Sequence, residues 1–286
     1  MAVKQKPARY SRARKPSRKV SHSRNARGSA NPWLAAGAAL AGAAVIAAFI
    51  QMQRTEQKLA INEDTLCPVA GPVAISAVLI DATDTLDPVQ VASVRQLVER
   101  QIRDAAPGTL FAFGVVAEDP AERGATRALC KPRAGTDVSQ ITQNVTAVQK
   151  RYDERFLGPV REILATLGTA GEANSSPIME SLQSILTGTP EFLSFEGPKQ
   201  VVLISDLLQH SEAMSFYRGE DWQSFSSSAA FGRMSENLRG ADVTIYQISR
   251  PPLARIQDPA VVEDFWARYL DRQGARPPEL IRVGDL

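Results

Sequence analysis

The sequence predicts an α/β domain with a mostly parallel, doubly wound sheet flanked by helices, preceded by one transmembrane helix. Three observations predict this. Apolar runs of strand length alternate with helices that carry an apolar stripe, a pattern typical of parallel sheets. Two of these runs end in an aspartate. A stretch of 18 residues near the N-terminus has neither charge nor proline.

Residues 1–32 form a basic tail. Its first 28 residues hold ten Lys or Arg and no acid, so the net charge of +2 conceals a remainder with 23 basic and 31 acidic groups. Interleaved Ser and Pro and the low apolar content predict a disordered segment. Such a basic run binds anionic lipid or nucleic acid, or simply enforces membrane topology. We favour topology, and expect no nucleic-acid binding by the main domain.

Residues 33–52 are predicted to be a single transmembrane helix, near the minimum length for a bilayer core. The positive-inside rule then makes the chain a single-pass inner-membrane protein with a cytoplasmic N-terminus and a periplasmic or extracellular main domain. A buried soluble helix and a cleaved signal peptide are the alternatives; the long basic segment and the lack of a small-x-small cleavage site count against the latter. The pairs Gly37/Ala41 and Ala38/Gly42 would let two such helices pack closely, which leaves a homo-oligomer open.

Two cysteines occur, Cys67 in the predicted linker 53–72 and Cys130 in the predicted main domain 73–286. Both follow the predicted span, so an oxidising compartment would let them pair, with two unpaired thiols as the alternative. Closing a loop of this length contributes roughly 4 kcal/mol in the chain-entropy model. Neither cysteine has the spacing of a zinc site.

The main domain divides into predicted strands and helices in alternation. Proline and an N-terminal aspartate mark the start of the first helix, and a Gly-Pro pair is expected to break the long helical run. The predicted strands are Val73–Asp81, Thr109–Ala117, Thr126–Lys131 at an edge, Gln200–Asp206, Val243–Ile248 and Leu280–Val283. The predicted helices start at Pro88, Val138, Val160, Pro177, Ala229 and Pro259, with a polar insertion over Gln209–Ser228.

Oxygen-bearing side chains gather where two strands end. Asp81, Thr83 and Thr85 follow the first strand, Asp206 ends a later strand, and Ser176 lies at a helix start. Open α/β sheets place ligands at the carboxyl ends of their strands, so these segments are expected to converge. Carboxylate and hydroxyl oxygens suit Mg²⁺, which keeps several waters and leaves a position open for another ligand.

These residues resemble the metal-ion-dependent adhesion site of von Willebrand factor type A (vWA) domains, which have a Rossmann-like fold. That site uses a DxSxS motif after the first strand, a Thr before a later helix and an Asp after a later strand. The resemblance spans residues 73–272 and implies Thr83, Thr85 and Ser176 as direct ligands, with Asp81 and Asp206 binding partly through water. All three serine–threonine exchanges retain a hydroxyl, while their altered methyl groups change the space around the ion.

The resemblance implies a membrane-anchored binding module whose Mg²⁺, or Mn²⁺ or Ca²⁺, completes its coordination with an acidic side chain of a partner protein. A metal-free structural subunit of an envelope complex is one alternative. A Mg²⁺-dependent phosphohydrolase or nuclease is another. A phosphatase of the haloacid-dehalogenase type would need DxDxT, whereas Thr83 stands at the second position and Asp84 is out of register. We therefore expect no catalytic residues and no enzyme.

Overall fold

The computed structural model describes residues 42–50, 60–139, 144–166, 173–234, 238–249 and 258–283. The chain forms two compact units, residues 1–53 and residues 54–286. In the first unit, residues 42–50 are helical. Within the described ranges, no helix has both the length and the apolar character needed to cross a membrane. The predicted tail, most of the predicted span 33–52 and residues 53–59 lie outside the described residues.

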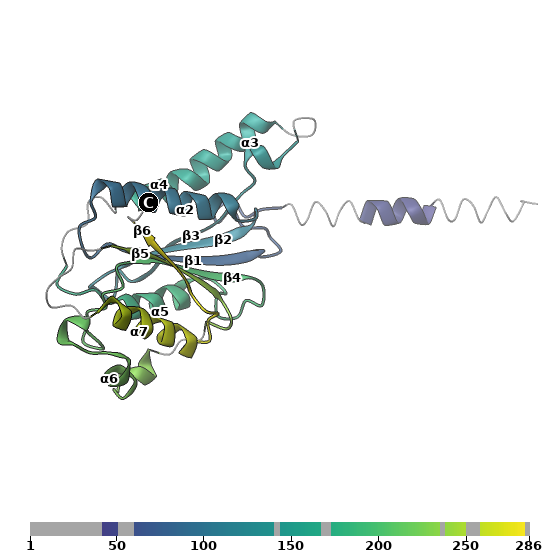
Figure 1. The fold of residues 1–286 in the computed structure, drawn as a ribbon. Coiled ribbons are helices and arrows are strands. Elements are labelled where there is room, and N and C mark those ends of the chain that lie inside the picture. The colour runs from purple at the N-terminus through teal and green to yellow at the C-terminus, as the bar shows by residue number, and fades with distance from the viewer. Residues whose placement is uncertain are drawn as a thin grey trace, which may run out of the picture. The chain divides into compact units, whose positions relative to one another are not determined.

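The second unit is built on a six-stranded sheet with helices on both faces (Figure 1). The strand order is β3-β2-β1-β4-β5-β6, and only the pairing of β3 with β2 is antiparallel. This architecture confirms the predicted α/β class with a mostly parallel sheet flanked by helices, and it is consistent with a Rossmann-like fold. The strands are β1 (Ala74–Asp81), β2 (Thr109–Val116), β3 (Gly124–Cys130), β4 (Lys199–Ser205), β5 (Asp242–Ile248) and β6 (Glu279–Val283).

Alternation along β1 divides the interior into two cores. Ile75, Ala77 and Leu79 pack with helices α5 (Ile178–Gly188) and α7 (Pro259–Arg272) on one face. Val78 and Ile80 pack on the other face with α2 (Pro88–Asp104), α3 (Val145–Tyr152) and α4 (Gly158–Thr166). Seven of the eight β1 residues are buried, as a central strand covered on both faces requires. The chain direction across the sheet reverses between β1 and β4, which creates a switch point at their carboxyl ends.

Helix α2 begins as the sequence predicts. Asp87 accepts hydrogen bonds from the backbone N–H groups of Val89 and Gln90, and the Asp87 N–H donates to Oε1 of the Gln90 side chain. Pro88 occupies the first turn, where its missing N–H costs nothing. This reciprocal cap fixes the chain as it leaves the loop that follows β1.

The predicted break at Gly158-Pro159 is wrong. Helix α3 (Val145–Tyr152) continues through a π-helical turn, Asp153–Leu157, directly into α4 (Gly158–Thr166). The Gly158 N–H bonds to the Asp153 carbonyl, five residues back, and this wider turn makes room for a proline that cannot donate. The start at Val138 is wrong as well: a 3₁₀ turn, Gly135–Asp137, precedes it, and α3 begins after the Asn144 cap.

The polar insertion also folds differently from the prediction. Its helix is the short α6 (Trp222–Ser226), whereas the region predicted as a helix from Ala229 holds a 3₁₀ turn, Phe231–Arg233, in its described part. A second 3₁₀ turn covers Phe216–Arg218. Aromatic packing explains the difference, because Trp222 and Phe225 lie edge-on to Phe265 of α7, at centroid distances of 6.0 and 5.5 Å.

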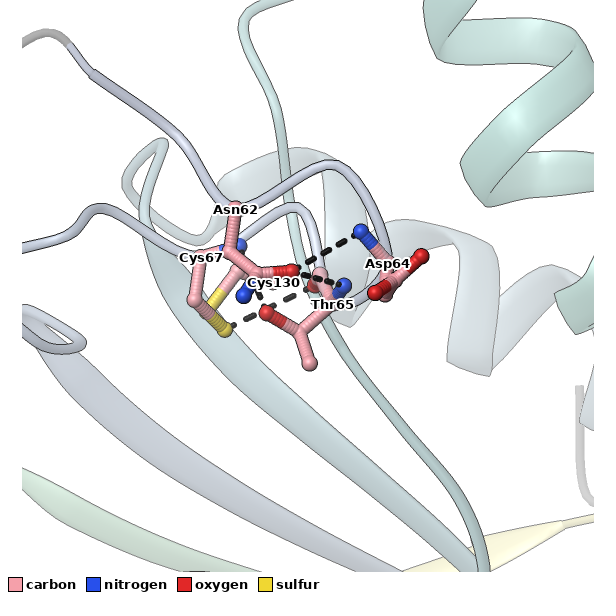
Figure 2. Close-up of a disulfide and its surroundings, with 5 residues drawn as sticks. All are labelled: Asn62, Asp64, Thr65, Cys67 and Cys130. Atoms are coloured by element: carbon pink, nitrogen blue, oxygen red, sulfur yellow. Dashed lines mark hydrogen bonds between the residues drawn. A yellow bond between two sulfur atoms is a disulfide. The ribbon is translucent and has the colours of Figure 1, made fainter.

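Residues 60–73, here called the entry segment, are tied to the edge of the sheet by a disulfide (Figure 2). The predicted bridge between Cys67 and Cys130 is confirmed, with an S–S distance of 2.07 Å and a Cα–Cα distance of 4.7 Å. Asn62 accepts from the backbone N–H groups of Asp64 and Thr65, and the Cys130 N–H donates to the Thr65 carbonyl at 2.8 Å. The entry segment is therefore part of the folded unit.

Candidate cation site at the carboxyl ends of β1 and β4

The candidate site is centred on Asp81, the last residue of β1. Its side chain lies among the loops at the switch point, and only 5% of its surface is exposed. A buried carboxylate is tolerated only where hydrogen bonds or positive charges compensate for the water it has lost. The partners of Asp81 therefore define what the site can do.

Asp81 accepts four hydrogen bonds. Its Oδ1 receives the backbone N–H of Thr83 at 3.1 Å and the Thr83 hydroxyl at 2.6 Å. Its Oδ2 receives the hydroxyls of Ser205 at 2.7 Å and Ser176 at 3.3 Å. An ionised carboxylate has about four lone-pair positions, so the acceptor capacity of Asp81 is filled. Three separate segments of the chain meet on this one side chain.

Backbone hydrogen bonds hold the same segments together. Ser176 and His210 exchange two N–H···O=C bonds of 2.8 Å each, which joins the start of α5 to the loop after β4. The Ala173 N–H donates to the Thr83 carbonyl at 2.8 Å, which joins the loop before α5 to the loop after β1. The hydroxyls are thus positioned by paired backbone rather than by flexible side chains.

Sequence reasoning missed two residues of the site. Ser205 precedes the predicted Asp206, and its hydroxyl both donates to Asp81 and accepts from the Leu207 N–H at 2.9 Å. Gln209 is fully buried; its Oε1 accepts the Met179 N–H in the first turn of α5, and its Nε2 donates to Glu180 at 3.0 Å. The feature that could have pointed to Gln209 is its polar side chain at the end of a continuously buried stretch, residues 201–209.

The loop after β4 takes an unusual backbone path. Leu207 has a φ of 68°, in the left-handed region that a leucine rarely adopts. Its carbonyl accepts the indole N–H of Trp266 at 2.9 Å, inside the core. Trp266 of α7 therefore fixes the turn that presents Ser205 and Asp206.

The five predicted ligands occupy different environments. Asp81, Thr83 and Ser176 are brought together by the hydrogen bonds described above. Asp206 is buried, and its Oδ1 accepts from the Leu208 N–H at 2.9 Å, within its own turn. Thr85 lies on the exposed side of the loop after β1.

The donor set fits a hard cation held mainly by hydroxyl oxygens. The hydroxyls of Thr83 and Ser176 give their protons to Asp81, so their lone pairs remain available for a metal ion. Asp81 itself would act through those hydroxyls, because their bonds and those of Ser205 and the Thr83 N–H fill its acceptor positions. Among the described residues, no group of three or more His, Cys, Asp or Glu side chains could hold a metal ion.

The fold and the site together define an α/β protein with an oxygen-lined cluster at the switch point of its sheet. No protein-family model matches the chain, and no curated protein matches it significantly.

Proposed function

We propose that the chain is a membrane-anchored, vWA-like binding module that docks an acidic group of a partner protein through a Mg²⁺-type ion. The ion would be held by Thr83, Thr85 and Ser176, with Asp206 contributing through water and Asp81 through the hydroxyls that bond to it. The observation that carries the proposal is the convergence of two of these hydroxyls, from loops 93 residues apart, on the buried carboxylate of Asp81.

Binding is favoured over turnover by the state of Asp81. A carboxylate that accepts four hydrogen bonds has its lone pairs occupied, which leaves none free to take a proton from a substrate or to attack it. Hydroxyl ligands, by contrast, leave most of the charge of a divalent ion uncompensated. Such an ion attracts an external carboxylate strongly, and a carboxylate on a partner protein would supply it.

Titration of Mg²⁺ and of Mn²⁺ into the full-length protein tests the metal. We expect binding heat and a rise in melting temperature, both lost in Thr83→Val, which removes one hydroxyl at nearly constant volume. Thr136→Val, at an exposed position of a 3₁₀ turn, is the matched control. If the wild type gives neither heat nor a shift up to about 10 mM, above the affinity range of extracellular cation modules, the metal-dependent proposal fails.

The acidic partner group has its own test. With Mn²⁺ bound, the relaxation of water protons reports the waters on the ion, and acetate is a minimal mimic of a partner carboxylate. We expect acetate to displace a bound water and lower the relaxation enhancement, whereas acetamide, which is neutral, leaves it unchanged. An equal response to both would argue against docking through a carboxylate.

A metal-free structural subunit is the second candidate, and one observation favours it. The four hydrogen bonds to Asp81 already tie the three loops together without an ion. The cation titration separates the two candidates. A melting temperature insensitive to Mg²⁺, together with a large loss of stability in Asp81→Asn, would support the structural role.

The proposed localisation places the second unit outside the cytoplasm. The disulfide between Cys67 and Cys130 supports it, since such bonds persist in oxidising compartments. Two separate fusions after Leu286 test this. Alkaline phosphatase, which is active only outside the cytoplasm, should be active, and a fluorescent protein that matures only in the cytoplasm should not fluoresce. The reverse pattern would overturn the proposed topology.

A further inference from the structure

Two lysines of the second unit are almost completely buried, and they differ in how their charge is satisfied. Lys131 is 4% exposed, and its Nζ donates to the carbonyls of Arg103 at 2.9 Å and Ala105 at 2.6 Å, at the C-terminus of α2. Lys199, the first residue of β4, is 7% exposed. Among the described residues its Nζ makes no hydrogen bond or ion pair, and it lies 5.5 Å from the centre of the Phe192 ring.

A buried ammonium without a hydrogen-bonded anion is costly, so its persistence calls for an explanation. Burial and the nearby charge of Arg239 lower the pKa of Lys199, and the charge of Glu196 opposes them in part. Lys131 donates to two backbone carbonyls and so stabilises the C-terminus of α2. Lys199 is similarly buried, but its ammonium has no such acceptors in the part of the chain that the structure describes.

Lys199 lines a cavity of about 530 Å³ at the amino-terminal ends of β4 and β5. Two arginines line it as well, Arg239 and Arg276. The acidic side chains of the lining are Glu196 and Asp242, and Asp242 is engaged with Arg276 at 2.9 Å. The side chains that line the cavity therefore carry a net positive charge, although the chain beyond its basic tail is acidic overall.

The wall of the cavity is held in place by backbone hydrogen bonds. The Leu238 and Gly240 N–H groups donate to the carbonyls of Gln273 and Gly274, each at 2.7 Å, and the Arg276 N–H donates to Ala241 at 3.0 Å. Between them, Arg239 adopts a φ of 46°, in the left-handed region that is unfavourable for a non-glycine residue. The cationic side of the cavity is thus preformed.

We propose that this cavity, the Lys199 pocket, binds a phosphate-class oxyanion. A dianionic tetrahedral group can accept hydrogen bonds from an ammonium and a guanidinium at once, and it supplies the counter-charge that Lys199 lacks. The pocket lies at the opposite end of β4 from Asp81, so the inference is independent of the proposed cation site.

Phosphate can come from solution or from a phospholipid headgroup. The entry segment reaches the sheet at the same edge, since the Val73 N–H bonds to the Gly108 carbonyl where β1 and β2 begin. A headgroup is the second possible source because the predicted membrane span, residues 33–52, precedes the entry segment in the chain.

The test uses full-length protein in a neutral detergent, melted in inorganic phosphate and in chloride of equal ionic strength. At ten times its Kd, phosphate should raise the melting temperature by roughly 3–6 °C over chloride. Lys199→Met should lose at least ten-fold in affinity. Lys150→Met, which removes an exposed lysine of α3, should respond as the wild type.

Melts without phosphate add a second readout. A lysine with a structural role would make Lys199→Met less stable, whereas an uncompensated charge makes the variant as stable as the wild type or more so. In a separate arm, dihexanoylphosphatidic acid replaces phosphate, with dihexanoylphosphatidylcholine as control. A shift with inorganic phosphate supports a soluble ligand, and a shift with phosphatidic acid alone supports a headgroup. No Lys199-dependent shift in either arm, or a destabilised Lys199→Met protein, overturns the proposal.

Discussion

Replacing Asp81 by asparagine tests whether this carboxylate holds the carboxyl edge of the sheet together. The change keeps the shape of the side chain but removes its charge and turns one oxygen into a donor. If the amide oxygen keeps the two bonds from Thr83, the amide nitrogen then faces the hydroxyls of Ser176 and Ser205, which now donate to Oδ2 at 3.3 and 2.7 Å. The Ser205 hydroxyl already accepts from the Leu207 N–H.

The cost follows from these bonds. A hydrogen bond to a charged group contributes about 1.5–3 kcal/mol, and two are disrupted. The hydroxyls can rotate to accept from the new amide, which recovers part of the loss, so we expect the free energy of unfolding to fall by about 2–4 kcal/mol. At about 2–4 °C per kcal/mol for a unit of this size, the melting temperature should fall by roughly 4–16 °C.

The assay is thermal and urea unfolding of the full-length protein in EDTA, so that metal binding plays no part. Glu122→Gln, an exposed carboxyl-to-amide change between β2 and β3, is the matched control and should shift stability by less than about 0.5 kcal/mol. A loss of less than about 1 kcal/mol in Asp81→Asn, or an equal loss in both variants, would refute the view that Asp81 organises the three loops.

Three further predictions concern other parts of the second unit. Replacing Cys67 and Cys130 by serine should lower the free energy of unfolding by up to about 4 kcal/mol in denaturant titrations, because 63 residues of separation would no longer be closed into a loop. Trp266→Phe should cost about 1–3 kcal/mol in the same titrations, because the buried Leu207 carbonyl loses one of its two donors and the smaller ring leaves a cavity. Hydrogen bonding from Arg218 holds the pKa of Glu220 below its usual 4.5; stability from this pair is therefore present above pH 4.5 and is lost as the pH falls through the lower folded pKa. Glu220→Gln should flatten pH-dependent unfolding in that range.

Much of the fold could be predicted because its signals are local. The continuous apolar run of β1 and the cap at Asp87 act over a few residues, and the structure places both as expected. The π-helical turn before Pro159 could not be predicted. A Gly-Pro pair ends most helices, and only the widened turn at Asp153–Leu157 lets this one continue.

In the candidate site, too, local contacts could be predicted and long-range contacts could not. Asp81 and Thr83 are two residues apart, so the spacing of the motif already indicates that their side chains are neighbours. Ser205 and Gln209 act through partners 124 and 30 residues away, and no periodicity marks such partners. Lys131 and Lys199 are equally obscure in the sequence, because each stands at a strand boundary. The difference between them depends on a helix end in one case and a cavity in the other.

The disulfide sets the path that mechanical tension would take. Tension on the chain before Cys67 passes through the sulfur–sulfur bond to Cys130, the last residue of the antiparallel edge strand β3. The strands and the helix between the two cysteines, β1, α2, β2 and β3, are then bypassed by the load. A pull from the amino-terminal side cannot peel β1 from the centre of the sheet while the bond is intact. Reduction would transfer the same force to the hydrogen bonds of β1, and with it to the loop that carries Asp81.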